Sequence, residues 1–421
     1  MSTHYDVAAF LIGIVSLLLS AHLVGLLFEK FAMPRVVGEI LGGLLLGPSV
    51  LGAVSPALSE FLVPTTDGPK QMLEAFYWLG LTLLMFIAGF RIQHRFDSGD
   101  RLVICALLAS ATLVPFAAGW LVTEYYNFST YTGPQGNSIT TTLIIAIAVA
   151  VTSIPVISKI FIDLGLITTR FARIVLVTST IQDILLWAIL AIATGLSGIE
   201  AGVSTQSLGW VEIAKAAVNP MLFCVGGLLL GPFILKVIKR LPVISVVRSM
   251  KLGSTLLWCF MIAALAALLD VNVIFGALIA GLTLGRLKGG EMESEKGQIS
   301  GIALAFFIPI YFALVGHSID IPGAFEPGLF IGFLVFSTTV EGGCVLLAMR
   351  AIRLNWATSF NFAVAMNTRG GPGIVLASMT YSLGLIDERL FVALVLTAIV
   401  TSMLSGVWFK YLVSRGRPLM S

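Results

Sequence analysis

The chain has 421 residues, of which 57% are hydrophobic and only 11% are charged. Soluble domains contain about a quarter charged residues, so this composition excludes a soluble globular protein. The net charge of +3 decides little until the charges are assigned to loops, and the 42 glycines fit helices that pack closely in lipid. The sequence therefore predicts an all-α polytopic membrane protein, and we expect no nucleic-acid partner.

Thirteen segments are apolar and long enough to cross a bilayer, which takes about 20 residues. In chain order they are about 7–28, 34–52, 72–90, 102–123, 140–162, 173–197, 212–237, 253–270, 272–286, 299–316, 328–349, 356–383 and 389–412. The ninth is short and rich in Gly, so the eighth and ninth can also be counted differently. The chain ends soon after the last span, and we expect one membrane domain over 1–421 without a cytosolic regulatory domain.

The basic residues are distributed unevenly between the two sets of alternate loops. Most of the 25 Lys and Arg residues lie in one set, whereas the other set carries only Lys70, Lys215 and Arg389. Cytoplasmic loops are the ones enriched in Lys and Arg. The sequence therefore predicts a multi-pass protein of the cell (inner) membrane, with its N-terminus outside and its C-terminus in the cytoplasm.

Two predicted spans are interrupted near their centres. The fifth contains Thr152-Ser153-Ile154-Pro155, and the twelfth contains the segment from Asn367 to Gly373. Pro and Gly break the helical hydrogen-bond ladder, and such backbone survives at membrane depth only inside protein or beside a wet cavity. Broken spans at corresponding places of two halves point to a transporter's binding site. Their odd offset predicts an inverted repeat of spans 2–6 and 9–13 with two broken, crossing helices.

The dipeptide Gln182-Asp183 lies inside the apolar stretch 174–194. A carboxylate at that depth is costly and marks ion or proton pathways by default. We expect Asp183 to bind a proton and an alkali cation (K⁺ or Na⁺) in turn, since both compete for one carboxylate whose pKa lies near the working pH. Thr152, Ser153 and Gln182 are expected to be auxiliary ligands or organisers. The alternative is that Asp183 is the structural partner of a buried base.

Other polar residues in the spans are expected to tune this site. Arg369 can pair with Asp183 or with Glu341, and we favour a structural ion pair that holds the twelfth span over direct substrate binding. Lys159 either offsets the dipoles of the broken helices or extends to the cytoplasmic interface. His317, at the end of the tenth span, is either a pH sensor or, as we favour, a solvated boundary residue.

Six motifs in order resemble those of one transporter family. They are MPRVVGEILGGLLLGPSVLG (33–52), LGLTLLMFIAGFRI (79–92), VAVTSIPVISKIFIDLGL (149–166), TSTIQDILLWAIL (178–190), FFIPIYFALVGHSID (306–320) and MNTRGGPGIVLAS (366–378). Over nearly the whole chain the sequence resembles the Kef/NapA-type monovalent cation:proton antiporters, the second cation:proton antiporter family.

The resemblance implies a fold, a mechanism and a set of site residues. It implies the NhaA/NapA-like inverted-repeat fold, with core spans at about 102–197 and 328–412 and dimerisation spans at about 7–90 and 212–316. It also implies elevator-type alternating access in a homodimer, with Asp183 as the shared site of the cation and the proton and with no cofactor.

Two departures from the family pattern bear on charge movement. Electrogenic relatives have Asp-Asp where this chain has Gln182-Asp183, which favours one-for-one electroneutral exchange. Glu341 stands where many relatives have a Lys that pairs with the ion-site carboxylate. It either faces Asp183 and couples to its titration, or pairs with Arg369 and leaves Asp183 free.

Readings from other classes remain open. A cation channel would conduct without proton coupling, and a solute symporter would use the same broken-helix architecture. An intramembrane aspartyl protease needs two facing Asp residues, whereas only Asp183 is a deep Asp, so we expect the protein not to be an enzyme.

Overall fold

The computed structural model describes residues 4–31, 33–65, 67–91, 98–200, 251–269, 271, 273–285 and 293–420, with a few positions between 222 and 233. Within these ranges the regular structure is helical, and the only β-type pairing is an isolated bridge between Thr132 and Ile386. The predicted all-α class is therefore confirmed.

The described helices follow the predicted spans closely. They are α1 (His4–Lys30), α2 (Arg35–Leu46), α3 (Leu51–Val54), α4 (Pro56–Leu62), α5 (Asp67–Arg91), η1 (Ser98–Asp100), α6 (Arg101–Leu108), η2 (Ala109–Leu113), α7 (Val114–Tyr125), η3 (Phe128–Tyr131), α8 (Ser138–Ala150), α9 (Ile154–Asp163), α10 (Arg170–Glu200), α13 (Lys251–Leu268), α14 (Val273–Gly285), α15 (Glu293–Ile302), η5 (Ala303–Phe307), α16 (Ile308–His317), α17 (Ile321–Ala324), α18 (Pro327–Ala351), α19 (Trp356–Met366), α20 (Gly370–Ser382) and α21 (Glu388–Ser414).

The span count can be compared with these helices. Of the described helical segments, eight are long and apolar enough to cross a membrane, and α8, α13 and α14 are shorter apolar helices. Each predicted span other than 212–237 coincides with one to three of the described helical segments. Because 212–237 lies largely outside the described residues, the count of thirteen stays a prediction.

Local sequence signals explain where several core helices begin. Asn137, Asn355 and Asp387 each accept a hydrogen bond from a backbone N–H in the first turn of α8, α19 and α21. These side chains satisfy N–H groups that have no partner within the helix. A π-helical turn, η2, lies between α6 and α7 just before Pro115, which has no N–H to donate.

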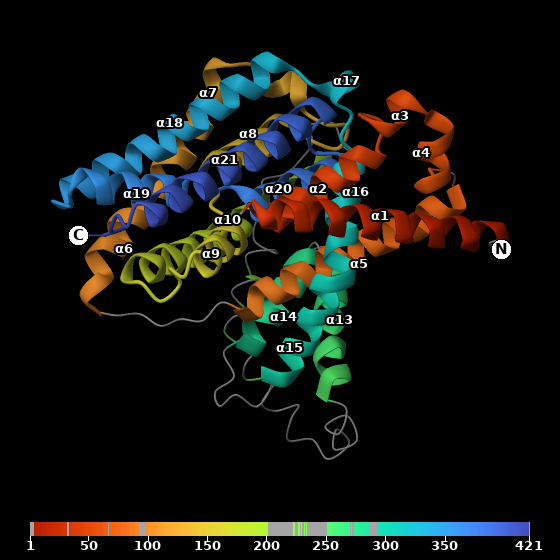
Figure 1. Cartoon of the computed structure of the whole chain (residues 1–421), viewed down its shortest axis with the longest axis horizontal. Coiled ribbons are helices and arrows are strands. Elements are labelled where there is room, and N and C mark those ends of the chain that lie inside the picture. Colours follow the sequence, from red (N-terminus) through yellow and green to blue (C-terminus); the bar gives the residue numbers. More distant parts are fainter. Residues whose placement is uncertain are drawn as a thin grey trace.

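The helix contacts fall into two groups. In one group α1, α2, α5, α14 and α16 pack on one another, with α13 against α14. In the other group α6, α7, α8, α9, α10, α18, α19, α20 and α21 pack together. Figure 1 shows α7, α8, α18 and α21 side by side and α1, α2, α5 and α16 gathered beside them. Contacts between the groups are sparse, and α2 touches α20 there.

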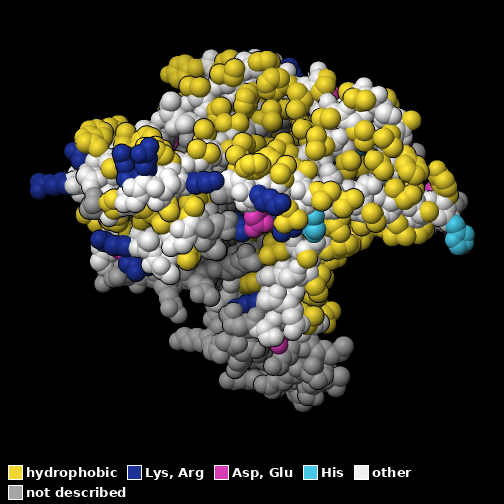
Figure 2. Space-filling model, viewed as in Figure 1, with side chains coloured by type: hydrophobic (Ala, Val, Ile, Leu, Met, Phe, Trp, Pro, Cys, Tyr) yellow, Lys and Arg dark blue, Asp and Glu magenta, His cyan; other side chains and the backbone are white. Residues whose placement is uncertain are grey.

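The surface agrees with a membrane location. Hydrophobic side chains cover much of the upper and right-hand parts of the face shown in Figure 2, whereas Lys and Arg gather toward the end that carries the C-terminus in Figure 1. Large exposed apolar side chains occur along both groups, for example Leu19 on α1 and Ile331 on α18. In water such a surface would be costly, and in lipid it is the expected exterior.

Candidate functional site

The two interrupted spans meet at their breaks. α8 ends at Ala150 and α9 begins at Ile154, while α19 ends at Met366 and α20 begins at Gly370. The Ser153 backbone N–H donates to the carbonyl oxygen of Thr368 over 2.5 Å. The Ser153 hydroxyl in turn accepts from the N–H of Gly371 at 3.1 Å. The predicted crossing of the broken helices is therefore a direct backbone contact, buried in protein.

Gly370 makes this close approach possible. Its φ is +25°, and a Cβ added there would lie 2.4 Å from Cγ2 of Val156 and 2.8 Å from Oγ of Ser153. A side chain would therefore meet both an unfavourable backbone conformation and a steric clash. This position explains one of the glycines in the motif that interrupts the twelfth span.

Arg369 holds the end of α8. Its guanidinium donates to the carbonyl oxygens of Ala148 (3.2 Å) and Val149 (2.9 Å), and to the carboxylate of Glu341 (2.8 Å). The Arg369 side chain is 2% exposed and the Glu341 side chain is fully buried. A cation at a helix C-terminus is favourable, because the last carbonyls carry partial negative charge. Of the two predicted pairings, the structure contains the one between Arg369 and Glu341.

Gln182 completes the same helix end. Its fully buried side-chain amide donates to the carbonyl oxygen of Ala150 and, over 2.9 Å, to that of Ala111. Ala111 lies four residues before Pro115, which cannot supply the usual helical N–H. Gln182 therefore joins the π-helical turn to the broken helix, and its amide group donates to backbone carbonyls of both.

Thr152 binds the end of α19, the helix before the second break. Its hydroxyl donates to the carbonyl oxygen of Met366 at 2.6 Å and approaches Oε1 of Glu341 at 3.3 Å. The Met366 carbonyl is the last of α19, so it has no N–H partner of its own helix. Thr152 and Ser153 are both fully buried, and their hydroxyls belong to the crossing.

Asp183 faces a cavity of about 540 Å³ between the two helix groups. Its walls come from α2, α5, α14 and α16 on one side and from α9, α10 and α20 on the other. Asp183 is 8% exposed, and its Oδ1 is buried without a hydrogen-bond partner among the described residues. A buried, unpaired carboxylate oxygen calls for an ion, a proton or water.

The lining is otherwise mostly apolar, with two hydroxyls. Ser158 and Thr180 line the cavity together with Asp183, and neither was among the predicted ligands. Thr180 lies three residues before Asp183, a spacing that places both side chains on one helix face, so helix periodicity would have identified it. Hydroxyl and carboxylate oxygens are ligands that suit hard cations.

The four residues predicted to bind the cation therefore lie in two different places. Asp183 lines the cavity, whereas Gln182, Thr152 and Ser153 are absent from its lining and organise the helix crossing beside it. The structure brings Glu341 and Arg369 together at that crossing. Their roles in transport stay predictions.

Lys159 lies away from the end of α8. Its Nζ donates to Oε1 of Glu29 on α1 at 2.9 Å, and both side chains are more than a third exposed. The cation at the α8 terminus is Arg369, and Lys159 instead links α9 to the other helix group. An exposed pair of this kind contributes little to stability.

Comparisons with known proteins identify the family. The model of the transmembrane sodium/hydrogen exchanger family matches residues 18–415. The chain is 28% identical to the Na(+)/H(+) antiporter NhaS4 of Synechocystis, over 94% of this chain and 95% of that protein. It is 26% identical to the Na(+)/H(+)-K(+) antiporter GerN of Bacillus cereus, over 96% of each.

Longer relatives match over part of their length. The K(+)/H(+) antiporter 1 of Saccharomyces cerevisiae is 27% identical over 95% of this chain, which spans 46% of that protein. Among solved structures, the sodium proton antiporter MjNhaP1 of Methanocaldococcus jannaschii has a TM-score of 0.61 at 16% identity, with 97% of this chain and 99% of that chain covered. At that identity the likeness shows the fold. The chain belongs to the sodium/hydrogen exchanger transmembrane family.

Proposed function

We propose that this chain is a secondary antiporter that exchanges protons for a monovalent cation, K⁺ or Na⁺, at Asp183. The observation that carries the proposal is the Asp183 carboxylate in a cavity between two helix groups, with its buried Oδ1 lacking a hydrogen-bond partner among the described residues. The matching relatives are named as Na⁺/H⁺ or K⁺/H⁺ antiporters, which supports the same activity here.

One carboxylate can serve both ions in turn. A proton or an alkali cation neutralises the Asp183 carboxylate, and binding of either one excludes the other. The hydroxyls of Ser158 and Thr180 add neutral oxygens on the cavity wall. No basic side chain of the described residues lines the cavity, so the Asp183 carboxylate stays available to the transported ions, whereas Glu341 is paired with Arg369.

This division supports one-for-one electroneutral exchange. Within the described residues, Asp183 is the sole acidic side chain that lines the cavity, so one site holds either one proton or one cation. Glu341 is separated from that exchange by its ion pair with Arg369 and by its hydrogen bond from Thr152. Its role is to hold the helix crossing.

We further propose elevator-type alternating access in a homodimer. The core would comprise the helices within 102–197 and 328–412, and the dimerisation domain those within 7–90 and 212–316. The sparse contacts between the two helix groups support sliding of one past the other. We place the protein in the cell membrane with its N-terminus outside and its C-terminus in the cytoplasm. The Asp183 cavity then faces inward, because it includes Ile167 in the loop just before Arg170.

The test is cation-dependent dissipation of a pH gradient in proteoliposomes. We expect Na⁺ or K⁺ to dissipate the gradient in the parent protein and Asp183→Asn to reduce the rate to that of empty liposomes. Asn keeps the shape of the side chain and removes its charge and titration. Running each alkali cation with and without a potential clamp identifies the preferred cation and the charge moved.

Glu124→Gln is the matched control, because Glu124 is an exposed carboxylate at the end of α7. It should exchange at the parent rate. Retained exchange in Asp183→Asn would overturn the assignment of the site. Cation conductance without proton movement in the parent would identify a channel instead.

A further inference from the structure

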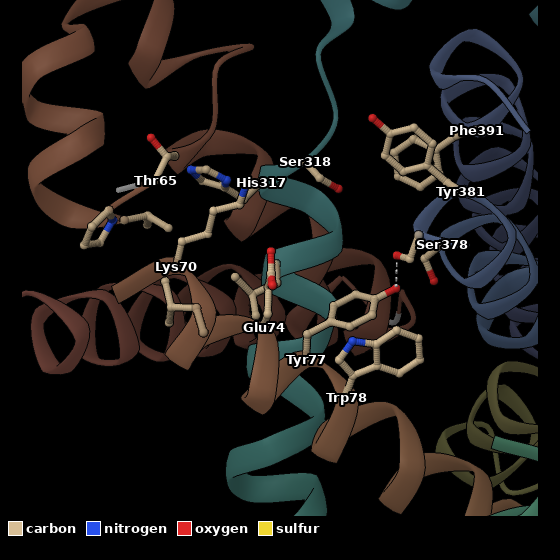
Figure 3. A pocket seen from close by; sticks show the side chains of 15 residues that line it. Thr65, Lys70, Glu74, Tyr77, Trp78, His317, Ser318, Ser378, Tyr381 and Phe391 are labelled. Carbon is tan, nitrogen blue, oxygen red and sulfur yellow. Dashed lines mark hydrogen bonds between the residues drawn. The ribbon is translucent and has the colours of Figure 1, made fainter. Parts of the chain in front are cut away.

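A second cavity lies nearer the start of α5 than the Asp183 cavity does. Its volume is about 390 Å³, and its lining includes Lys70, Glu74, Tyr77, His317, Ser378 and Tyr381. Figure 3 shows these side chains converging from α5, α16 and α20. In the proposed orientation this cavity faces the outside, because Lys70, in the first turn of α5, lies on the side that is poor in basic residues. We call it the outer cavity, and the one at Asp183 the inner cavity.

The outer and inner cavities share three helices. α5 contributes Tyr77 to the outer cavity and Leu84 to the inner one. α20 contributes Ser378 to the outer cavity and Val375 to the inner one, one helical turn apart. α16 likewise lines both cavities. The two cavities therefore lie end to end along one seam, with α5 and α16 on one wall and α20 on the other.

Two hydrogen bonds cross this seam between the cavities. The hydroxyl of Tyr311 on α16 lies 2.6 Å from Oγ of Ser378 on α20, and both residues are almost fully buried. The hydroxyl of Tyr77 on α5 lies 3.1 Å from Oγ of Ser382, one turn further along α20. The two tyrosine rings are in contact, with centroids 5.1 Å apart. Tyr77, Ser378 and Ser382 line the outer cavity, and none of the four residues is in the lining of the inner one.

We propose that Tyr77 and Tyr311, bonded to Ser382 and Ser378, are the outer gate that separates Asp183 from the external solution. This inference rests on the proposed antiport function. With the gate closed, the inner cavity opens toward the loop at Ile167. When α20 moves relative to α5 and α16, both hydrogen bonds break and the two cavities join, which exposes Asp183 to the outside.

The chemistry of the gate suits a reversible closure. Ser378 and Ser382 are four residues apart, so they lie on one face of α20 and meet both tyrosines at once. A hydrogen bond contributes about 0.5–1.5 kcal/mol net, so two of them bias the closed state without locking it. The released hydroxyl groups are neutral oxygen ligands, which can coordinate a passing cation or hydrogen-bond to the water molecules around it.

The experiment measures access from outside, independently of transport. The four cysteines are first replaced by serine or alanine, and Val375→Cys then places a thiol on the inner cavity beside the gate. Right-side-out vesicles are treated with a membrane-impermeant thiol reagent. We expect slow labelling in this background and labelling about fivefold faster after Tyr311→Phe, the factor expected for loss of one such hydrogen bond.

The remaining variants separate a gate from a packing effect. Ser378→Ala should speed labelling as much as Tyr311→Phe does, and the double variant should add little, because both remove one hydrogen bond. Tyr77→Phe should act in the same direction. Tyr381→Phe is the matched control: Tyr381 lines the same outer cavity and stacks on Phe391, and its hydroxyl has no hydrogen bond to the part of the chain that the structure describes.

Three outcomes of the labelling experiment would decide the question. Unchanged labelling in Tyr311→Phe and Ser378→Ala, with the proteins folded by size-exclusion chromatography, would overturn the gate. An equal increase in Tyr381→Phe would also overturn it, because the effect would then be one of packing. Faster labelling in a protein that fails to exchange cations for protons would keep the gate and refute the proposed antiport.

Discussion

The helix crossing and the helix seams beside it are held together by different forces. At the crossing, buried polar side chains bind backbone carbonyls, as Arg369 and Gln182 do at the end of α8. At the α2–α16 seam, glycines let the backbones touch. A Cβ on Gly43 would lie 1.8 Å from the carbonyl oxygen of Ala313, and one on Gly316 would lie 1.9 Å from that of Ile40.

The difference follows from the state of the backbone. Unbroken helices satisfy their own N–H and C=O groups, so close van der Waals contact is enough to join them in lipid. Broken helices expose carbonyls that need donors, and side chains from other helices supply them. Polar side chains therefore brace the helix crossing, whereas Oδ1 of the nearby Asp183 has no hydrogen-bond partner among the described residues.

The largest expected loss of stability tests the crossing itself. Arg369→Leu leaves Glu341 buried without a counter-charge and removes donors from the end of α8, so we expect it to lower the free energy of unfolding by about 3–5 kcal/mol. Thermal unfolding in detergent, followed by fluorescence-detected size exclusion, measures the effect.

Arg389→Leu is the control for that variant, because Arg389 forms exposed pairs with Asp387 and Glu326. We expect a loss below about 1 kcal/mol there. Pairing Arg369→Leu with Glu341→Leu should recover part of the loss by removing the stranded charge. Equal costs for Arg369→Leu and Arg389→Leu would contradict the role assigned to the crossing.

An intermediate effect tests the glycine seam. Gly316→Ala places a methyl group against the Ile40 carbonyl, so α2 and α16 must separate, and we expect a loss of about 1–3 kcal/mol. The same thermal assay applies. Gly332→Ala on α18 is the control, since nothing lies within 4 Å of its added Cβ among the described atoms. This substitution should be neutral or stabilising. Equal losses of stability at both glycines would contradict the close packing of α2 on α16 as a source of stability.

The smallest expected effects on stability come from substitutions of two adjacent residues, Gln182 and Asp183. Gln182→Met keeps the size of the side chain but leaves the Ala111 and Ala150 carbonyls without their donor, so we expect a loss of about 1–2 kcal/mol. Asp183→Asn removes a buried carboxylate whose Oδ1 has no hydrogen-bond partner in the described part of the chain, so the melting temperature should stay unchanged or rise. A lower melting temperature for Asp183→Asn than for Gln182→Met would indicate that Asp183 is a structural residue.

The sequence by itself determined the helical class, the positions of the breaks and the identity of the deep carboxylate. Hydropathy and helix-breaking residues are local properties, so a span of about 20 apolar residues, or a Gly and Pro cluster within it, can be recognised without knowing its neighbours. The same holds for Asp183, whose cost in lipid follows from its apolar surroundings in the chain.

Only the tertiary structure decided which polar residues face the cavity and which brace the crossing. Gln182 and Asp183 are neighbours in sequence, yet successive helical residues point about 100° apart, and one meets backbone while the other meets the cavity. The partners are remote in sequence: Thr152 and Glu341 are 189 residues apart, and Arg369 and Val149 are 220 apart. Arg369 donates to Glu341 and to the carbonyls at the end of α8, and no local pattern in the sequence encodes these partners.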